Sequence, residues 1–156
     1  MGEHRLRRPP RSAARRMIPD DESKLDQIAT RDLIEFVNAK DDETRAAAIY
    51  ALRTRATADA VTALITVLSN PDSFLARTAC DSLIHIGKAA TSKLIEALND
   101  KNIQTRGLAA RAFAHIKDES SIPALFNALN DESMMAQYWE DEALERMGVG
   151  QIYFQP

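Results

Sequence analysis

The chain has few of the residues that cross-link or interrupt a fold, with one cysteine, five glycines and six prolines among its 156 residues. The single cysteine, Cys80, cannot form an internal disulfide, which is typical of a protein in a reducing, cytoplasmic compartment. No stretch approaches the roughly 20 consecutive apolar residues that span a bilayer, so we expect no membrane partner. Good helix formers dominate the rest, and this composition predicts an all-α chain.

A strong net charge is also absent, because the formal value is only −3, but the two signs are unevenly distributed. Residues 1–16 contain six of the 20 basic residues and one of the 23 acidic residues, which leaves 14 basic and 22 acidic residues from Met17 onward. An acidic body disfavours a groove for nucleic acid, so we expect no nucleic-acid partner.

The composition divides the chain into three segments. We expect residues 1–22 to be a basic, disordered and functionally silent arm, because Arg-, Pro- and Ala-rich sequence without apolar periodicity cannot offset its ordering entropy. The alternatives are an arm for nucleic acid or an anionic surface, a transit-like presequence, and translated sequence ahead of a start at Met17. A secretory signal would need an apolar core, which this segment lacks. Residues 23–148 are the folded body, and residues 149–156 form an apolar tail.

The body repeats itself about every thirty residues. One landmark is an apolar pair at Leu33-Ile34, Leu64-Ile65, Leu94-Ile95 and Leu125-Phe126, spaced 31, 30 and 31 residues apart. A second landmark, with the same three spacings, is the pair Ala51-Leu52, Ser82-Leu83, Ala112-Phe113 and Ala143-Leu144. Two landmarks in phase predict an α-solenoid of about four helix pairs, in which stacking of neighbouring units builds the core.

Helical periodicity indicates which residues of each second helix are packed. Four residues before the large apolar member of the second landmark stand Ala48, Ala79, Ala109 and Glu140. Spacings of three and four place this column on the same face as the landmark itself, and its small side chains allow close helix packing. We interpret Glu140, and Arg55 in the column three residues after the landmark, as polar capping features of the terminal units.

Acidic or amide residues recur where one helix gives way to the next, at Asp41-Asp42, Asn70-Pro71-Asp72, Asn99-Asp100 and Asn130-Asp131. Their side-chain oxygens suit free helix N-termini, as do those of Asp20 to Ser23 ahead of a short first helix. Arg45 and Arg106 share one column, and we expect an arginine there to bridge to an aspartate of an adjacent turn.

The repeat resembles a known family. The run Leu94-Ile95-Glu96-Ala97-Leu98-Asn99-Asp100, followed by Arg106 to Ile116, is similar to a HEAT-like repeat, and more narrowly to the phycobilisome-lyase HEAT-like class. The resemblance covers about residues 30–148. The ending, with Tyr138-Trp139, Glu142 to Gly150 and Tyr153 to Pro156, is similar to cyanobacterial members.

This resemblance implies a protein-binding module that interacts with a phycobiliprotein or another lyase subunit, as a chaperone or lyase-type accessory factor in bilin attachment or phycobilisome turnover. It transfers no catalytic residues, so independent catalysis stays an open question. We expect no resident cofactor, and the resemblance leaves room for a transient linear tetrapyrrole. The alternative is a generic scaffold or regulator unrelated to phycobilisomes.

A second family with similar repeats, the deoxyhypusine hydroxylases, binds di-iron through His-Glu dipeptides. Here His85 and His115 are each followed by isoleucine, so those ligand pairs are absent. The two histidines share one column in consecutive units, and a metal between them is the alternative to two exposed groove residues. No Cys, Asp or Glu in that column completes a ligand set, so we expect no metal site.

The polar columns of the second helices predict a concave groove for a protein partner, with Arg111 exposed at its centre. Tyrosine and arginine, which often dominate interface energies, recur in it, although any solvated helix face is also rich in charge. We expect Trp139 to fill space at the end of the solenoid and Cys80 to be a small buried group. The candidate groove residues are Tyr50, Arg53, Arg77, Asp81, His85, Arg111, His115, Tyr138, Glu142 and Arg146.

Overall fold

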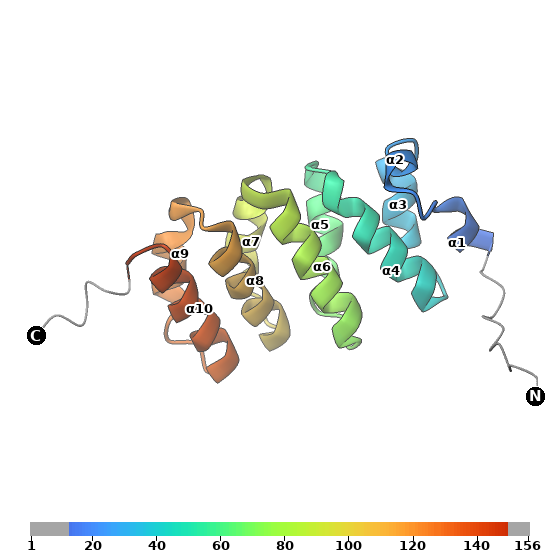
Figure 1. Ribbon diagram of the computed structural model, residues 1–156. Coiled ribbons are helices and arrows are strands. Elements are labelled where there is room, and N and C mark those ends of the chain that lie inside the picture. The colour runs from blue at the N-terminus through green and yellow to red at the C-terminus, as the bar shows by residue number, and fades with distance from the viewer. Residues whose placement is uncertain (1–12, 150–156) are drawn as a thin grey trace, which may run out of the picture.

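A computed structural model describes residues 13–149, and every regular element in that range is a helix (Figure 1). The chain enters through two short helices, α1 (Ala13–Met17) and α2 (Glu22–Leu25). Four helix pairs follow, whose first helices are α3 (Thr30–Phe36), α5 (Ala58–Val67), α7 (Thr91–Ala97) and α9 (Ile122–Ala128). The second helices are α4 (Asp42–Ala51), α6 (Ser73–Ile86), α8 (Ile103–Ile116) and α10 (Met134–Arg146). Short 3-10 turns lie at Leu52–Thr54, Gly87–Ala90 and Glu119–Ser121.

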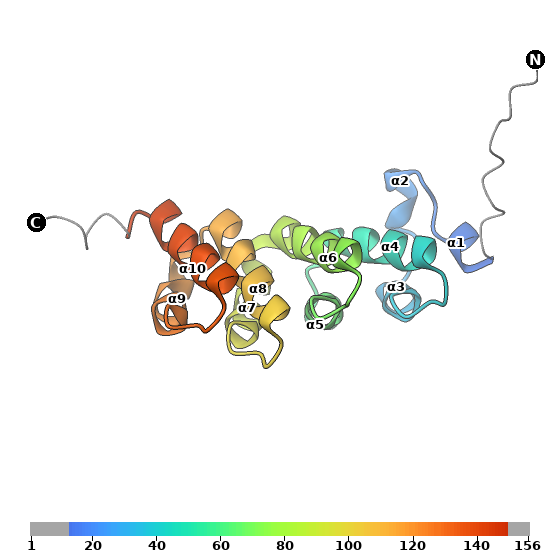
Figure 2. The same cartoon turned by 90° about the horizontal axis from the view of Figure 1, so that it is seen from below.

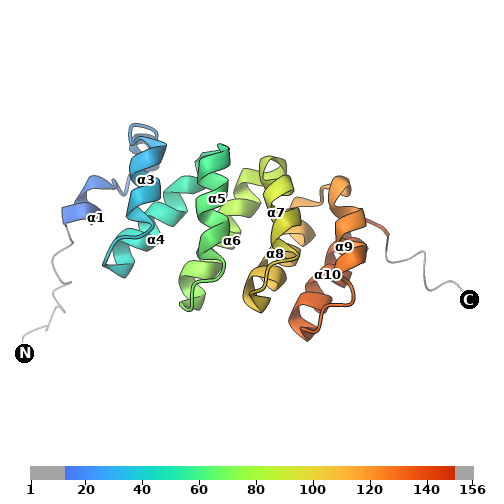
Figure 3. The ribbon, with the colours of Figure 1, turned by 180° about the vertical axis from the view of Figure 1, so that it is seen from behind.

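The pairs stack side by side into an elongated, two-layered molecule. Figure 2 shows the second helices in one layer and the first helices in the other, and Figure 3 shows the layer of first helices from behind. The first and last described helices, α1 and α10, lie at opposite ends of the stack. This arrangement confirms the predicted α-solenoid of four helix pairs. Within the described range, no helix is both long enough and apolar enough to cross a bilayer.

Both sequence landmarks lie in the core. The leucine that opens each unit is fully buried, and so are Leu52, Leu83 and Phe113 of the second landmark. Ala48, Ala79 and Ala109 are also fully buried, because a methyl group at this column lets neighbouring helices approach closely. Repetition of these columns therefore builds one continuous core along the stack.

A side-chain oxygen caps the N-terminus of each second helix. For α4 and α6 the capping residue is one of the predicted turn residues. Asp41 accepts a hydrogen bond from the Thr44 amide at 2.8 Å, and Asp72 accepts one from the Phe74 amide at 2.8 Å. In the last two units the capping residue comes two positions later than the predicted pair, at Asn102 and Ser133. There, Asp100 and Asp131 instead accept a hydrogen bond from the amide of the capping residue, so they shape the turn before it.

The predicted arginine bridge is present once in full. Arg106 on α8 donates to both carboxylate oxygens of Asp131, at 2.5 and 3.0 Å, and its Nη1 donates to the Asp100 carbonyl at 2.9 Å. Both side chains are largely buried, and the Arg106 hydrogen bond lowers the pKa of Asp131. Arg45 instead pairs within its own unit, with Asp42. The bridge therefore joins the third unit to the turn of the fourth.

Packed structure begins earlier than the sequence predicted. The arm was expected to extend to residue 22, but α1 contacts α4 and Ile18 is only 3% exposed. Arg15 is buried as well, forming an ion pair with Asp20 and placing its Nε 3.5 Å from the Glu43 carboxylate. The remaining arm residues, 1–12, and the tail residues 150–156 lie outside the described range. The prediction was wrong for residues 13–22, because the composition of this segment does not reveal that Arg15 and Ile18 are buried where α1 packs against α4.

The two presumed polar caps of the terminal units differ from each other. Arg55 donates to the carbonyls of Leu25 and Ile28 at 2.7 and 3.1 Å, so it ties α2 to the first unit. Glu140 is fully buried, and neither carboxylate oxygen has a hydrogen-bond partner among the described residues. Its interpretation as a polar capping feature of the last unit was wrong, because its column faces inward there as in the other units.

Candidate functional site

The four second helices, with the 3-10 turn after α4, carry all ten residues predicted to line a groove. Seven of them are exposed and three, Arg53, Arg111 and Glu142, are partly buried. The exposed residues span all four units, so the structure places the predicted residues along the whole length of this layer. The layer is called the second-helix row below.

Several of these side chains pair with one another. Arg111 on α8 donates to Asp81 on α6 at 2.8 Å, which links the third unit to the second. Arg146 donates to Glu142 one turn earlier in α10, at 2.6 Å. The Arg53 guanidinium lies 4.0 Å from the centroid of the Tyr50 ring. Several charged side chains of this row are therefore paired, either between neighbouring helices or within one helix.

Arg111 is less accessible than predicted. Its side chain keeps 17% of its exposure, because it lies between the neighbouring helices α6 and α10. Beside the Asp81 contact, its Nη1 lies 3.2 Å from the sulfur of Cys80, and its guanidinium lies 5.9 Å from the Trp139 ring centroid. Arg111 is thus a cross-link within the row, and a charge reversal there would disturb the fold.

Cys80 is the buried small group that the sequence predicted, with no exposed surface. Burial raises the pKa of its thiol to about 11, despite the opposing influence of the Arg111 charge. The thiolate is the reactive form of cysteine, so this thiol is unreactive at neutral pH. Cys80 contributes to the packed core.

Trp139 was expected to fill space at the end of the solenoid. It is partly buried in the last helix and packs against the core, and it also belongs to the second-helix row, where it was not predicted. Its ring meets Tyr138 edge-on at 5.2 Å between centroids and lies 6.4 Å from His115 on α8. Desolvation, with the charges of Arg111 and Arg146, lowers the pKa of His115. A sequence signal existed, since Trp139 is the sole tryptophan and adjoins a predicted groove residue. Column-wise comparison missed it because only one unit carries it.

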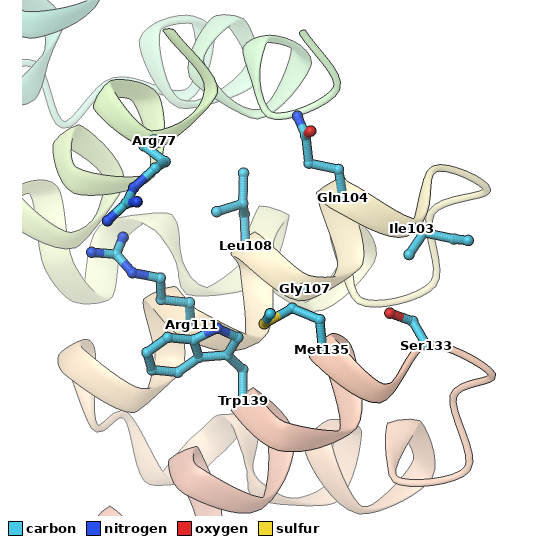
Figure 4. A pocket seen from close by; sticks show the side chains of 9 residues that line it. All are labelled: Arg77, Ile103, Gln104, Gly107, Leu108, Arg111, Ser133, Met135 and Trp139. Atoms are coloured by element: carbon cyan, nitrogen blue, oxygen red, sulfur yellow. The ribbon is translucent and has the colours of Figure 1, made fainter. Parts of the chain in front are cut away.

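Trp139 lines a cavity of about 590 Å³ between α6, α8 and α10 (Figure 4). The lining side chains form an apolar surface with a cationic side: Leu108 and Met135 lie beside the indole, and the guanidinium groups of Arg77 and Arg111 converge from two helices. Gly107 leaves room there, since a Cβ at this position would come no closer than 3.9 Å to its neighbours. The volume of the cavity lies within the roughly 300–1,000 Å³ typical of ligand pockets.

A second hollow, of about 430 Å³, lies further along the same row between α4 and α6. Tyr50, Arg53, Asp81 and His85 contribute to its wall, so it contains four of the predicted residues. The sequence thus identified half of the residues that line this hollow, whereas it identified only Arg77 and Arg111 of the larger cavity.

The side chains that line the two hollows could bind another molecule through aromatic ring faces, apolar contacts and guanidinium groups. Within residues 13–149, no group of three or more His, Cys, Asp or Glu side chains could hold a metal ion. His85 and His115 are both exposed on the row, one on α6 and one on α8.

The chain is similar to known proteins in both sequence and structure. It is 33% identical over 102 residues to the phycobilisome maturation protein of Synechococcus elongatus; the match covers 65% of this chain and 49% of that protein, so the chain spans about half of that relative's length. The structure resembles that of the complex of CpcE and CpcF of phycocyanin lyase from Nostoc sp. PCC7120, with a TM-score of 0.54 and 22% identity, over 90% of this chain and 59% of that chain. At that identity the likeness shows the fold.

The sequence also matches a family model directly. The model of HEAT repeats matches residues 30–93 and again residues 91–150, which together cover the four helix pairs. The chain belongs to the HEAT-repeat family.

Proposed function

We propose that this chain is a protein-binding HEAT-repeat module that acts as a phycobiliprotein-interacting accessory factor, in bilin attachment or in phycobilisome turnover. Its partner is a phycobiliprotein or another lyase subunit, and it works in the cytoplasm without independent catalysis. Support comes from the 33% identity to a phycobilisome maturation protein, over a stretch that covers 65% of the chain.

The second-helix row is the proposed docking surface. The observation that carries this proposal is the concentration on one layer of the exposed tyrosines Tyr50 and Tyr138 and the ring–guanidinium contacts, beside two hollows. Aromatic and arginine side chains are the types that most often dominate interface energies. Extended surfaces formed by stacked helices are also the usual binding faces of solenoid proteins.

A linear tetrapyrrole is proposed as a transient guest of the same row. The cavity beside Trp139 has the size of a small-molecule site and combines an apolar wall with the guanidinium of Arg77, which would receive a carboxylate of such a pigment, whereas Arg111 already pairs with Asp81. No resident cofactor is proposed.

The test is direct binding of purified chains. Apo-phycobiliprotein subunits and lyase subunits are titrated into the full chain by calorimetry, with and without a linear tetrapyrrole. We expect saturable binding that Tyr138→Ala weakens at least tenfold, about 1.4 kcal/mol, because an exposed tyrosine near the centre of an interface commonly contributes that much. The control is Glu35→Lys on α3, an exposed residue of the other layer, which leaves binding unchanged.

Two outcomes contradict the proposal. If no phycobiliprotein chain or lyase subunit binds, the chain is a scaffold for unrelated partners, which is the alternative function. If Glu35→Lys abolishes binding and Tyr138→Ala does not, the docking surface is the layer of first helices.

A further inference from the structure

The cavity beside Trp139 opens on an unusual edge of the second-helix row. Phe74, Ile103, Met134 and Met135 are 65%, 50%, 85% and 63% exposed, although all four side chains are large and apolar. Each lies in the first turn of its helix, α6, α8 or α10. The corresponding positions of α4 hold the acidic residues Asp42 and Glu43, so the apolar edge covers only the last three units.

This edge is continuous with the cavity. Ile103 and Met135 contribute both to the edge and to the cavity wall, where Leu108 and Trp139 extend the apolar surface inward. Large exposed apolar patches next to a hollow are typical of sites that another molecule covers. We call the edge and the cavity together the anchor site.

Positive charge at the anchor site is incompletely neutralised. Arg77 is exposed and has no ion pair or hydrogen bond within residues 13–149, and Figure 4 shows its guanidinium directed toward that of Arg111. Among the described residues, Asp81 is the one carboxylate that pairs with either guanidinium, through its 2.8 Å contact with Arg111. Two converging guanidinium groups with one carboxylate leave room for a second carboxylate, supplied from outside.

We propose that the anchor site binds an amphipathic helical segment of a partner protein, one that inserts apolar side chains into the cavity and places a carboxylate on Arg77. This rests on the proposed protein-binding function and deepens it by naming the chemistry of the partner.

Geometry favours a helix as the occupant. The apolar edge runs across three neighbouring helices, whose axes in such packing lie about 8–10 Å apart. A helix carries its anchors at i, i+3, i+4 and i+7 on one face, which matches an elongated apolar strip with one deeper hollow. An extended strand would need an unpaired sheet edge for its backbone, and residues 13–149 contain only helices.

The experiment uses three synthetic helical peptides of about 18 residues, long enough to hold helical structure in water. The first has leucine at i, i+3, i+4 and i+7 with glutamate beside the apolar face, and the second has lysine in place of glutamate. The third has the composition of the first in scrambled order. Trp139 is the sole tryptophan, so its emission reports directly on occupation of the cavity, and anisotropy of a fluorescein label gives the affinity.

We expect the acidic amphipathic peptide to shift Trp139 emission and to bind at least tenfold more tightly than the other two. Arg77→Glu should weaken this binding at least tenfold and favour the lysine peptide instead. The matched control is Arg31→Glu on α3, whose side chain is 83% exposed and lines a hollow of the opposite layer; it should change nothing. Both variants alter exposed side chains, so both should keep the wild-type melting temperature.

Equal binding of the acidic and lysine peptides, or binding without a change in Trp139 emission, overturns the inference. So does a loss of affinity in Arg31→Glu equal to that in Arg77→Glu. The inference and the proposed function fail separately: a phycobiliprotein subunit that binds equally well to Arg77→Glu overturns the anchor site alone. Peptide binding that depends on Arg77, in a chain that binds no phycobiliprotein or lyase subunit, overturns the proposed function alone.

Discussion

At the N-terminal end of the solenoid, Arg55 stands in a column that holds Ile86 and Ile116 in the two inner units; at the C-terminal end, Glu140 stands where the other three units have alanine. The guanidinium of Arg55 bonds to two carbonyls of the segment containing α2 and to Asp26 at 3.1 Å. The side chain of Glu140 is fully buried, and within residues 13–149 its carboxylate has no hydrogen-bond partner. At the N-terminal end the Arg55 guanidinium is therefore largely paired, with only its Nε lacking a partner among the described residues, whereas at the C-terminal end both Glu140 oxygens lack one.

The difference shows that a column keeps its orientation even in a terminal unit. Arg55 projects toward the outer side of the first unit, where the chain supplies α2 as an extra element with free carbonyls. Glu140 lies on the inward face of α10, which packs closely on α8, and there burial excludes water as a partner. A polar residue at the end of a repeat array is thus stabilised only if its column faces something polar.

The largest expected effect is at Glu140. Burial, together with the charges of Asp131 and Asp141, raises its pKa to about 7, against the opposing influence of Arg106. The folded state then retains a proton that the unfolded chain releases near pH 4.5, so this residue lowers the free energy of unfolding as pH rises from about 4.5 to 7. We expect Glu140→Met, which keeps the volume, to stabilise the protein by up to about 3 kcal/mol at pH 8 and little at pH 4.5.

Urea unfolding of wild type and variant across this pH range measures the difference. Glu140→Gln is the matched control, since it removes the titration but retains a buried polar group. It should flatten the pH dependence as the methionine variant does, with a smaller gain. A difference between wild type and both variants that does not change with pH would show that the carboxyl does not titrate in this range.

A smaller effect of opposite sign is expected at Arg55. Arg55→Met keeps the aliphatic stem and removes the hydrogen bonds to the carbonyls of Leu25 and Ile28, so we expect a loss of about 2 kcal/mol. Hydrogen exchange should show reduced protection of the α2 amides, while those of α10 stay unchanged. Lys24→Met alters an exposed charge of α2 and serves as the control, with a change below about 0.5 kcal/mol.

The smallest effect tests whether the ends are independent. Arg55 and Glu140 lie in the first and last units, and contacts in a solenoid are made between neighbours. The double variant Arg55→Met, Glu140→Met should therefore show the sum of the two single changes to within about 0.5 kcal/mol. A double-mutant cycle by urea unfolding measures the coupling. A coupling energy above 1 kcal/mol would indicate that strain at one end is transmitted through the whole stack.

The sequence by itself determined the architecture. Leu33, Leu64 and their equivalents are buried because every inner unit meets the same neighbours, so that one column has one environment. For the same reason the periodicity placed all ten predicted groove residues on one layer. The bridge between Arg106 and Asp131 followed from the recurrence of arginine and aspartate at fixed offsets.

Tertiary structure alone decided the features that do not repeat. The cavity beside Trp139 depends on side chains from three different helices, including the space left by Gly107, and no single column encodes that combination. The sequence also did not predict that Arg111 is largely buried between α6 and α10, or that Glu140 lacks a hydrogen-bond partner among the described residues. A periodic pattern specifies the average surroundings of a position, whereas binding sites and buried charges depend on the particular side chains that meet there.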